Sequence, residues 1–563
     1  MKKSLRVISL LLALMLLFLT ACGSNPAVDE GQTGNEENPS AVTSDGSSIV
    51  IAQSSEVANL NPMIQPRTPD SNVQCMIFSF LVMPDENLNY VGDLAESWDI
   101  SEDGTVYTFH LRKGVKWHDG EDFNADDVIF TLTSLAAPTY NGGNDGRVMS
   151  IVGAPEYQAG TADSVEGLKK IDDHTVEVTL TTPNAAFLAN MYTSMLPEHI
   201  LGEVDPGTWG NDDFNRAPIG TGKYKFVEWK AGQYITLVRN DDYYGKKPTI
   251  ENVTMRFGAD TTLVAALMNG EIDVLYGLPA SEIENVEAMP NSGIYSYEQM
   301  TVYYIGLNQL VPSLSDLRVR QALAHALDKQ TIIDTVHGEG VSYVCDDVFP
   351  SNHWSHSENV TVYEYNPEKS KALLEEAGYV MNDSTGFYEK DGETLHLTFD
   401  MSTSTDGEAI AAMIQQQFKE VGVSMEVITQ DFATLAYTKL LPGEATEETT
   451  ADSFQMYTLG FGVEADPEEY NAYFSTSTGA GSWNFIHYSN AEVDQLFKDQ
   501  LLMSDPAERT ACFNKIAELI SQDVPWIPLY NKAGIAGLSN RVGNFCADFR
   551  GITFQIENWT VSE

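Results

Sequence analysis

Basic residues are scarce in this sequence of 563 residues. It has 32 Lys and Arg against 81 Asp and Glu, which gives a formal net charge of -49 at pH 7. Nucleic acid and anionic lipid repel so large a negative charge, which argues against both as ligands. The acidity either serves solubility or forms an acidic cleft that attracts cationic ligands such as peptide amines or metal ions, and composition alone leaves both open.

Cysteines are also few, and no CxxC pair is present among the five. This absence excludes a zinc-ribbon or redox motif. Outside the cytoplasm one or two disulfides are possible, while buried free thiols are the alternative. The cysteines concerned, apart from Cys22, are Cys75, Cys345, Cys512 and Cys546.

Catalytic motifs are missing. The sequence has no GxSxG, no HExxH and no GxGxxG after a strand, so a secreted hydrolase is the weakest hypothesis and no enzyme activity is predicted. Gly220-Thr221-Gly222 is not a phosphate loop, because Lys223 is followed by a strand pattern, and its glycines are predicted to need positive φ. His353 and His356 would bind one ion only on a helix, whereas Pro350 indicates a loop and no third ligand is evident. We predict no metal and no cofactor.

No apolar run is long enough to span a bilayer, but the N-terminus resembles a lipoprotein signal. Lys2, Lys3 and Arg6 precede an apolar segment from Ile8 to Leu19, the length of a signal-peptide core. Leu19 to Gly23 is similar to a bacterial lipobox, which implies that residues 1–21 are removed and Cys22 is lipidated. An ordinary secretory signal with a chance Cys is the alternative. Residues 22–47 lack aromatic and basic residues and are predicted to be a disordered acidic tether.

The remaining body alternates short β-rich runs with helical segments, a pattern typical of an α/β protein too long for one core. Tyr107, Phe109 and Leu111 alternate with polar residues, which predicts a half-buried strand. Asn124, followed by Asp126 and Asp127, is predicted to cap a helix.

Seven blocks of the body, in order, resemble the extracytoplasmic solute-binding proteins, family 5, of peptide- and nickel-type ABC importers. One block by itself would be weak, but seven in the family's order cover about five hundred residues. They are Asp93–Val128, Leu196–Leu201, Pro218–Pro248, Thr261–Leu275, Tyr304–Asn308, Asp316–Ile333 and Tyr365–Tyr379.

The resemblance implies an α/β, periplasmic-binding-protein-like fold (class II-type, cluster C), with two lobes joined by two crossing strands and an extra subdomain on lobe I. Ligand contact with both lobes would favour closure. The implied divisions are lobe I at 48–84, 200–303 and 525–563, the extra subdomain at 85–199, and lobe II at 304–524.

The implied function is that of a monomeric substrate-binding lipoprotein on the outer face of the cell membrane, or facing the periplasm in a diderm. It would capture oligopeptides and deliver them to the permease subunits of an ABC transporter. A peptide-pheromone receptor is an alternative, as is a nickel-chelate, oligosaccharide, opine or haem binder of the same family. The sequence does not separate these.

In peptide-binding members of the family a segment similar to Gly-Trp-Cys-Ala-Asp lines the cleft, and the matching run here is Gly460 to Glu464. Its backbone would pair with an extended peptide, and Glu464 or Asp466 would hold the peptide amine. A solvated acidic turn is the alternative. Trp483 either walls a side-chain pocket or belongs to the core, and the Leu60–Met63 loop is a family landmark near the cleft mouth. The implied ligand-binding residues are Gly460, Phe461, Gly462, Glu464, Asp466, Trp483, Tyr304 and Asn308.

Overall fold

The computed structural model describes residues 46–562 except 65–66, 443–445, 478 and 480–481. The predicted signal peptide, Cys22 and nearly all of the predicted tether lie outside these residues. Among the residues described, no helix is both long and apolar enough to cross a membrane. Cys75, Cys345, Cys512 and Cys546 are free thiols, so the structure favours that alternative over disulfides.

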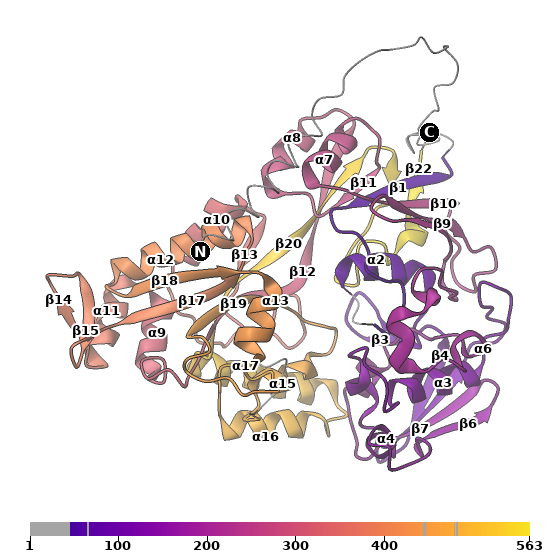
Figure 1. The fold of residues 1–563 in the computed structure, drawn as a ribbon, viewed down its shortest axis with the longest axis horizontal. Coiled ribbons are helices and arrows are strands. Elements are labelled where there is room, and N and C mark those ends of the chain that lie inside the picture. Colours follow the sequence, from indigo (N-terminus) through magenta and orange to yellow (C-terminus); the bar gives the residue numbers. More distant parts are fainter. Residues whose placement is uncertain (1–45, 65–66, 443–445, 478, 480–481, 563) are drawn as a thin grey trace, which may run out of the picture. The chain divides into compact units, whose positions relative to one another are not determined.

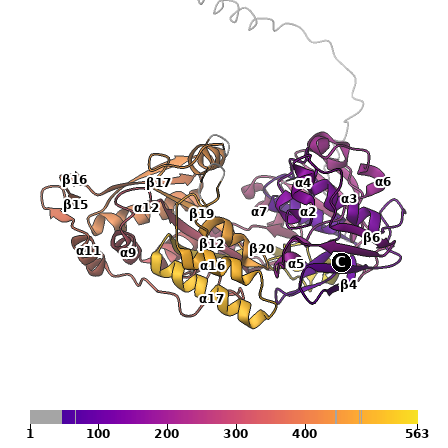
Figure 2. The same ribbon diagram turned by 90° about the horizontal axis from the view of Figure 1, so that it is seen from below.

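An 11-stranded sheet is the main element of the fold, and two long strands, β12 and β20, lie side by side at its centre (Figures 1 and 2). The order is β18-β17-β19-β12-β20-β11-β1-β10-β9-β8, and β13 also pairs with β20. The strands, in chain order, are β1 (Ser48–Gln53), β8 (Tyr224–Lys230), β9 (Tyr234–Arg239), β10 (Asn252–Phe257), β11 (Val274–Tyr276), β12 (Ser292–Leu307), β13 (Ser342–Val344), β17 (His396–Ser402), β18 (Ser424–Gln430), β19 (Met456–Gly462) and β20 (Trp526–Ser539).

A separate four-stranded sheet has the order β4-β5-β7-β6. In β5, Tyr107, Phe109 and Leu111 are buried, as the alternation predicted. Asn124 accepts a hydrogen bond from the backbone N–H of Asp126 and caps α3, which confirms the predicted helix start. The shorter strands are β2 (Val82–Pro84), β3 (Tyr90–Gly92), β4 (Ala95–Ile100), β5 (Val106–Leu111), β6 (Leu168–Asp172), β7 (Thr175–Thr179), β14 (Val380–Asn382), β15 (Phe387–Lys390), β16 (Glu393–Thr394), β21 (Val542–Gly543) and β22 (Thr560–Val561).

Helices flank both ends of the large sheet, and α16 packs beside α17 (Figures 1 and 2). The helices are α2 (Thr68–Ile77), α3 (Ala125–Leu135), α4 (Ala154–Gln158), α5 (Phe187–Asn190), α6 (Glu198–Leu201), α7 (Asp260–Met268), α8 (Ile283–Glu287), α9 (Leu317–His325), α10 (Lys329–His337), α11 (Pro367–Glu376), α12 (Thr405–Glu420), α13 (Phe432–Thr434), α15 (Asn471–Phe474), α16 (Ala491–Gln500) and α17 (Pro506–Asp523). Short 3₁₀-helices are η1 (Asp145–Val148), η2 (Pro206–Asn211), η3 (Asp213–Asn215), η4 (Ala280–Glu282), η6 (Pro467–Tyr470) and η7 (Ile556–Asn558), and η5 (Leu435–Leu440) is a π-helix.

The buried apolar residues form separate clusters. One cluster contains Phe109 of the four-stranded sheet together with Leu237 of β9 and Val253 of β10, so these two sheets share a core. Two further clusters lie mainly within residues 300–530, and one of them includes Tyr304, Phe474 and Trp526. The chain therefore folds around more than one core, as its length predicted.

The glycines before β8 have a different role from the one predicted. Neither Gly220 nor Gly222 has positive φ, so that part of the prediction is wrong. Instead, both lie against the end of α2. A Cβ on Gly220 would come within 2.0 Å of the Ile77 carbonyl oxygen, and one on Gly222 within 2.6 Å of it. The glycines are needed for close backbone approach.

Candidate ligand-binding site

Strand β19, which carries the predicted peptide-binding run, has one edge that is largely free. It pairs with β12 from Met456 to Gly462, whereas β17 pairs with it only at Met456 and Tyr457. The backbone N–H of Val463 donates to the carbonyl of Met300. Because antiparallel residues alternate in direction, the backbone groups of Gly460 and Gly462 face away from β12. Within the described part of the chain, no strand covers them there.

An aromatic cluster supports the same strand. The Phe461 ring lies 4.7 Å from that of Tyr470 and 4.6 Å from that of Tyr473. Trp483 packs at 5.8 Å from Tyr473, yet 48% of its surface is exposed. Trp483 is therefore not a core residue, and its exposed face is available to a ligand.

Tyr304 and Asn308 are buried in the core behind this strand. The Tyr304 ring stacks on Trp526 at 3.5 Å between centroids. The Asn308 side-chain amide donates to the carbonyls of Thr450 and Phe454. The structure therefore does not bring these two side chains together with Glu464, and neither has accessible surface for a ligand.

Asp466 is part of a buried ion pair. Its two carboxylate oxygens accept from Arg509, at 2.5 Å from Nη1 and 2.8 Å from Nη2. A bidentate pair of this kind fixes the turn that begins η6. The alternative of a solvated turn is thus wrong for Asp466, and its carboxylate is already committed to an arginine.

Glu464 differs from Asp466, because 46% of its side chain is exposed. Its only ion pair within the described residues is with Arg147, whose Nη2 lies 3.4 Å from Oε1. Its backbone N–H donates to the carboxylate of Glu469 at 3.1 Å. Burial raises the pKa of Glu469 to about 8 and that of Glu468 to about 7, and nearby Glu464 and Asp466, respectively, contribute.

His353 and His356, the pair considered for a metal, have protein partners. His353 is buried, and its Nε2 lies 3.1 Å from the carbonyl oxygen of Glu464, so Nε2 carries the hydrogen. Burial lowers the pKa of His353 to about 4. His356 pairs with the buried Asp347 at 3.1 Å. His353 thus positions the backbone of Glu464, a role that the sequence did not indicate.

A cavity of about 190 Å³ lies beside Glu464. The Leu60–Met63 loop contributes Pro62 and Met63, as its predicted place near the cleft mouth implied, while Asn61 accepts from the Met63 N–H in a turn. The sequence did not single out most of the lining. The other lining residues are Ser71, Gln74, Cys75, Phe80, Asn144, Arg147, Tyr192, Thr193, Ser194 and Arg550.

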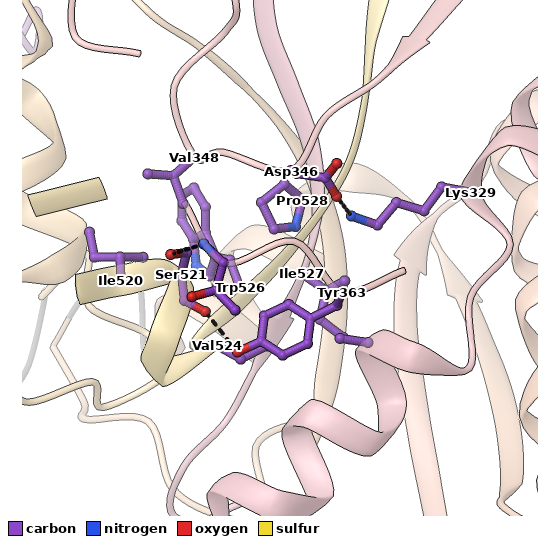
Figure 3. Close-up of a pocket in the computed structure, with 12 residues that line it drawn as sticks. Lys329, Asp346, Val348, Tyr363, Ile520, Ser521, Val524, Trp526, Ile527 and Pro528 are labelled. Carbon is purple, nitrogen blue, oxygen red and sulfur yellow. Dashed lines mark hydrogen bonds and ion pairs between the residues drawn. The ribbon is translucent and has the colours of Figure 1, made fainter. Parts of the chain in front are cut away.

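A second pocket, shown in Figure 3, lies among α10, α17 and β20 and is far smaller, at about 10 Å³. Lys329 pairs with Asp346 at 2.7 Å, and the Tyr363 hydroxyl donates to the carbonyl of Ser521. Such a volume holds at most one water molecule. This pocket is therefore a packing defect and not a ligand site.

The sequence model of a protein family, the bacterial extracellular solute-binding proteins, family 5 (middle region), matches residues 89–482 of this chain. The chain belongs to this family. The family consists of substrate-binding proteins of ABC transporters that work outside the cytoplasm, and its two-lobed α/β fold is the one predicted.

The similarity to known members of the family extends over nearly the whole chain. The oligopeptide-binding protein AppA of Bacillus subtilis (strain 168) is 28% identical over 571 residues, which cover 100% of this chain and 99% of AppA. Its structure with a nonapeptide has a TM-score of 0.75 and covers 92% of this chain and 99% of AppA.

Two other solved structures are similarly close. The ABC transporter substrate-binding protein CtaP of Listeria monocytogenes is 28% identical, with a TM-score of 0.80 and coverage of 92% and 100%. NikZ of Campylobacter jejuni, solved with Ni(L-His), is 27% identical, with a TM-score of 0.76 and coverage of 92% and 99%.

Proposed function

We propose that this family member is the substrate-binding lipoprotein of an ABC importer and that it captures oligopeptides. The observation that carries the proposal is the free edge of β19, which ends two residues before the exposed carboxylate of Glu464. An extended peptide adds its backbone to such an edge whatever its side chains are. A carboxylate at the end of the edge pairs with the peptide's terminal ammonium, which must not be buried unpaired.

Glu464 is the better candidate for the amine partner than Asp466. Asp466 already accepts both hydrogen bonds of Arg509, whereas Glu464 has one long contact with Arg147. A ligand amine gains more from a carboxylate whose oxygens are still available. Trp483 is proposed to contact a peptide side chain, while Tyr304 and Asn308 are proposed to support β12 and β19 from behind.

The relatives include a peptide binder and a nickel-chelate binder, and the residues of this chain favour peptide. AppA was solved with a nonapeptide, while NikZ carries Ni(L-His). In this chain His353 and His356 each have hydrogen-bond or ion-pair partners, and the described residues contain no group of three potential metal ligands. A pheromone receptor would use the same site. Deletion that abolished signalling but spared nutritional uptake would identify that role.

We further propose that the chain is a monomer anchored through lipidated Cys22 to the outer face of the cell membrane. Residues 48–84, 200–303 and 525–563 would form lobe I, with 85–199 as its extra subdomain and 304–524 as lobe II. The core that the four-stranded sheet shares with β9 and β10 supports placing the subdomain on lobe I. Closure of the lobes around peptide would be the state that the permease recognises.

The ligand retained through native purification tests the function. Mass spectrometry of the purified protein, before and after denaturation, is expected to release masses of short peptides. The matched control is the Glu464→Gln variant, which should carry less of the same peptides. Release of a nickel chelate or a sugar in place of peptide would overturn the proposal.

A further inference from the structure

The cavity beside Glu464 has a charge balance opposite to that of the chain. The chain has 81 acidic and 32 basic residues. Among the residues that line the cavity, however, Arg147 and Arg550 are cationic and only Glu464 is anionic. The lining therefore does not match the acidic cleft that composition had left open, and an anionic group can bind only to an arginine that its neighbours do not already neutralise.

Arg550 is unsuited to bind a ligand, because its own loop neutralises it. Its Nε and Nη2 donate to the carboxylate of Asp548, and its Nη1 donates to the carbonyl of Pro84. Only 7% of its side chain is exposed. Nε, Nη1 and Nη2 of Arg550 all donate to protein acceptors, so few of its N–H groups remain for a ligand carboxylate.

Backbone carbonyls orient the Arg147 guanidinium on one side, while its other side is partly exposed. Its Nη1 donates to the carbonyls of Ala189 and Tyr192, at 3.2 and 3.1 Å, near the end of α5. Its Nη2 has one carboxylate contact, 3.4 Å to Glu464 Oε1, and 25% of the side chain is exposed.

The buried ion pair of Arg509, on α17, with Asp466 is a bidentate pair with which Arg147 can be compared. Arg509 and Asp466 form two contacts of 2.5 and 2.8 Å. Compared with that pair, Arg147 is oriented by the backbone while its attraction for a carboxylate is only partly met. An orientation fixed in advance lowers the entropy cost of binding a new carboxylate.

We propose that Arg147 determines specificity by binding a ligand carboxylate that lies within one residue of the ligand's ammonium. The inference rests on the proposed function, in which Glu464 binds that ammonium. Because Arg147 and Glu464 are 3.4 Å apart, the two charges that they bind must also be close together. Two sources have this chemistry: the side chain of Asp or Glu at the first position of a peptide, and the α-carboxylate of a free amino acid.

Calorimetric titration of the full chain with matched peptides tests the inference. Asp-Ala-Ala-Ala is expected to bind about ten-fold or more tightly than Asn-Ala-Ala-Ala, since a charge-assisted hydrogen bond is lost in the second. Arg147→Gln should bring this ratio close to one, and Arg147→Lys should leave an intermediate ratio because the charge remains without the fork. Arg239→Gln, which removes an arginine of β9 that pairs with Asp241 and does not line the cavity, should keep the wild-type ratio.

Free L-alanine separates the two sources. Binding of L-alanine that is lost in Arg147→Gln assigns the carboxylate to an amino acid, while preference for the Asp peptide without L-alanine binding assigns it to a side chain. If the wild type binds both peptides equally and does not bind L-alanine, the role of Arg147 is refuted while peptide binding stands. If it binds neither peptide and no L-alanine, the proposed function fails and the inference with it. If Arg147→Gln does not fold, the ratio of affinities for the Asp and Asn peptides, compared between the wild type and Arg147→Lys, still tests the role of Arg147.

Discussion

Glu464 is held in place through its backbone, while its side chain is left exposed. His353 donates to its carbonyl, and Glu469 accepts from its N–H. The side chain contacts only Arg147 among the described charged groups. A residue with a fixed backbone and an available carboxylate is suited to bind an ammonium group without much loss of entropy.

Glu464→Gln is expected to weaken peptide binding by about 2–5 kcal/mol, because the peptide ammonium loses its charged partner in a desolvated site. N-acetylated peptides should bind the wild type poorly for the same reason. Titration calorimetry with free and blocked forms of one peptide measures both effects. Equal affinity of the wild type for the two forms would refute the role of Glu464.

His353 makes the stability pH-dependent. Its pKa is about 4 in the folded protein, because burial disfavours the charged ring, against about 6.5 when unfolded. Between these values the unfolded state binds more protons, so stability falls as the pH is lowered from about 6.5 to 4. The contribution approaches about 1.4 kcal/mol per pH unit.

The measurement is urea unfolding at several pH values between 7 and 5 for the wild type and His353→Gln. The variant should lose less stability on acidification than the wild type. Identical slopes for the wild type and His353→Gln would show that His353 is not buried in its neutral form.

Local patterns predicted elements well, whereas the site depends on contacts between distant residues. The alternation around Phe109 and the cap at Asn124 were correct because each depends on its immediate neighbours. Arg147 could not be predicted, since 317 positions separate it from Glu464. The tight approach of Gly220 to Ile77 likewise involves segments that only the fold brings together.

At the scale of elements, the free edge of β19 is the basis of the proposed recognition of peptide backbone. The run from Gly460 to Glu464 was found by resemblance, but its free edge required the pairing register of β12, β17 and β19. A Cβ on Gly460 would come within 2.8 Å of the Tyr303 ring, whereas one on Gly462 would meet only Oγ1 of Thr301 at 3.7 Å, so Gly462 is the glycine that leaves open surface on this strand. Close backbone approach by a ligand is easier where no Cβ projects.

A scan of backbone N-methylation along a bound peptide tests this role of β19. Alternate amides of an extended peptide face opposite edges, so methylation should weaken binding at every second position. Each lost backbone hydrogen bond is expected to cost about 0.5–1.5 kcal/mol. The intervening positions are the internal control. A profile without alternation would argue against addition of the peptide to the strand.

At the scale of the molecule, the proposed location depends on Cys22. Two or three acyl chains bind a membrane stably, because each buried methylene contributes about 0.8 kcal/mol and one chain alone is marginal. Cys22→Ser is expected to leave the precursor unlipidated and to release the protein from the membrane fraction. Cell fractionation with mass analysis of the N-terminus checks this. Retention of the variant in the membrane would reject the lipid anchor.

The proposed mechanism requires that ligand brings the lobes together across β12 and β20. A ligand that contacts both sides stabilises the closed state by its differential affinity for it. Small-angle X-ray scattering of the ligand-free protein, with and without saturating peptide, measures this change. We predict that the radius of gyration falls when peptide is added and that Glu464→Gln needs more peptide for the same change. An unchanged radius of gyration with saturating peptide would contradict the proposed mechanism.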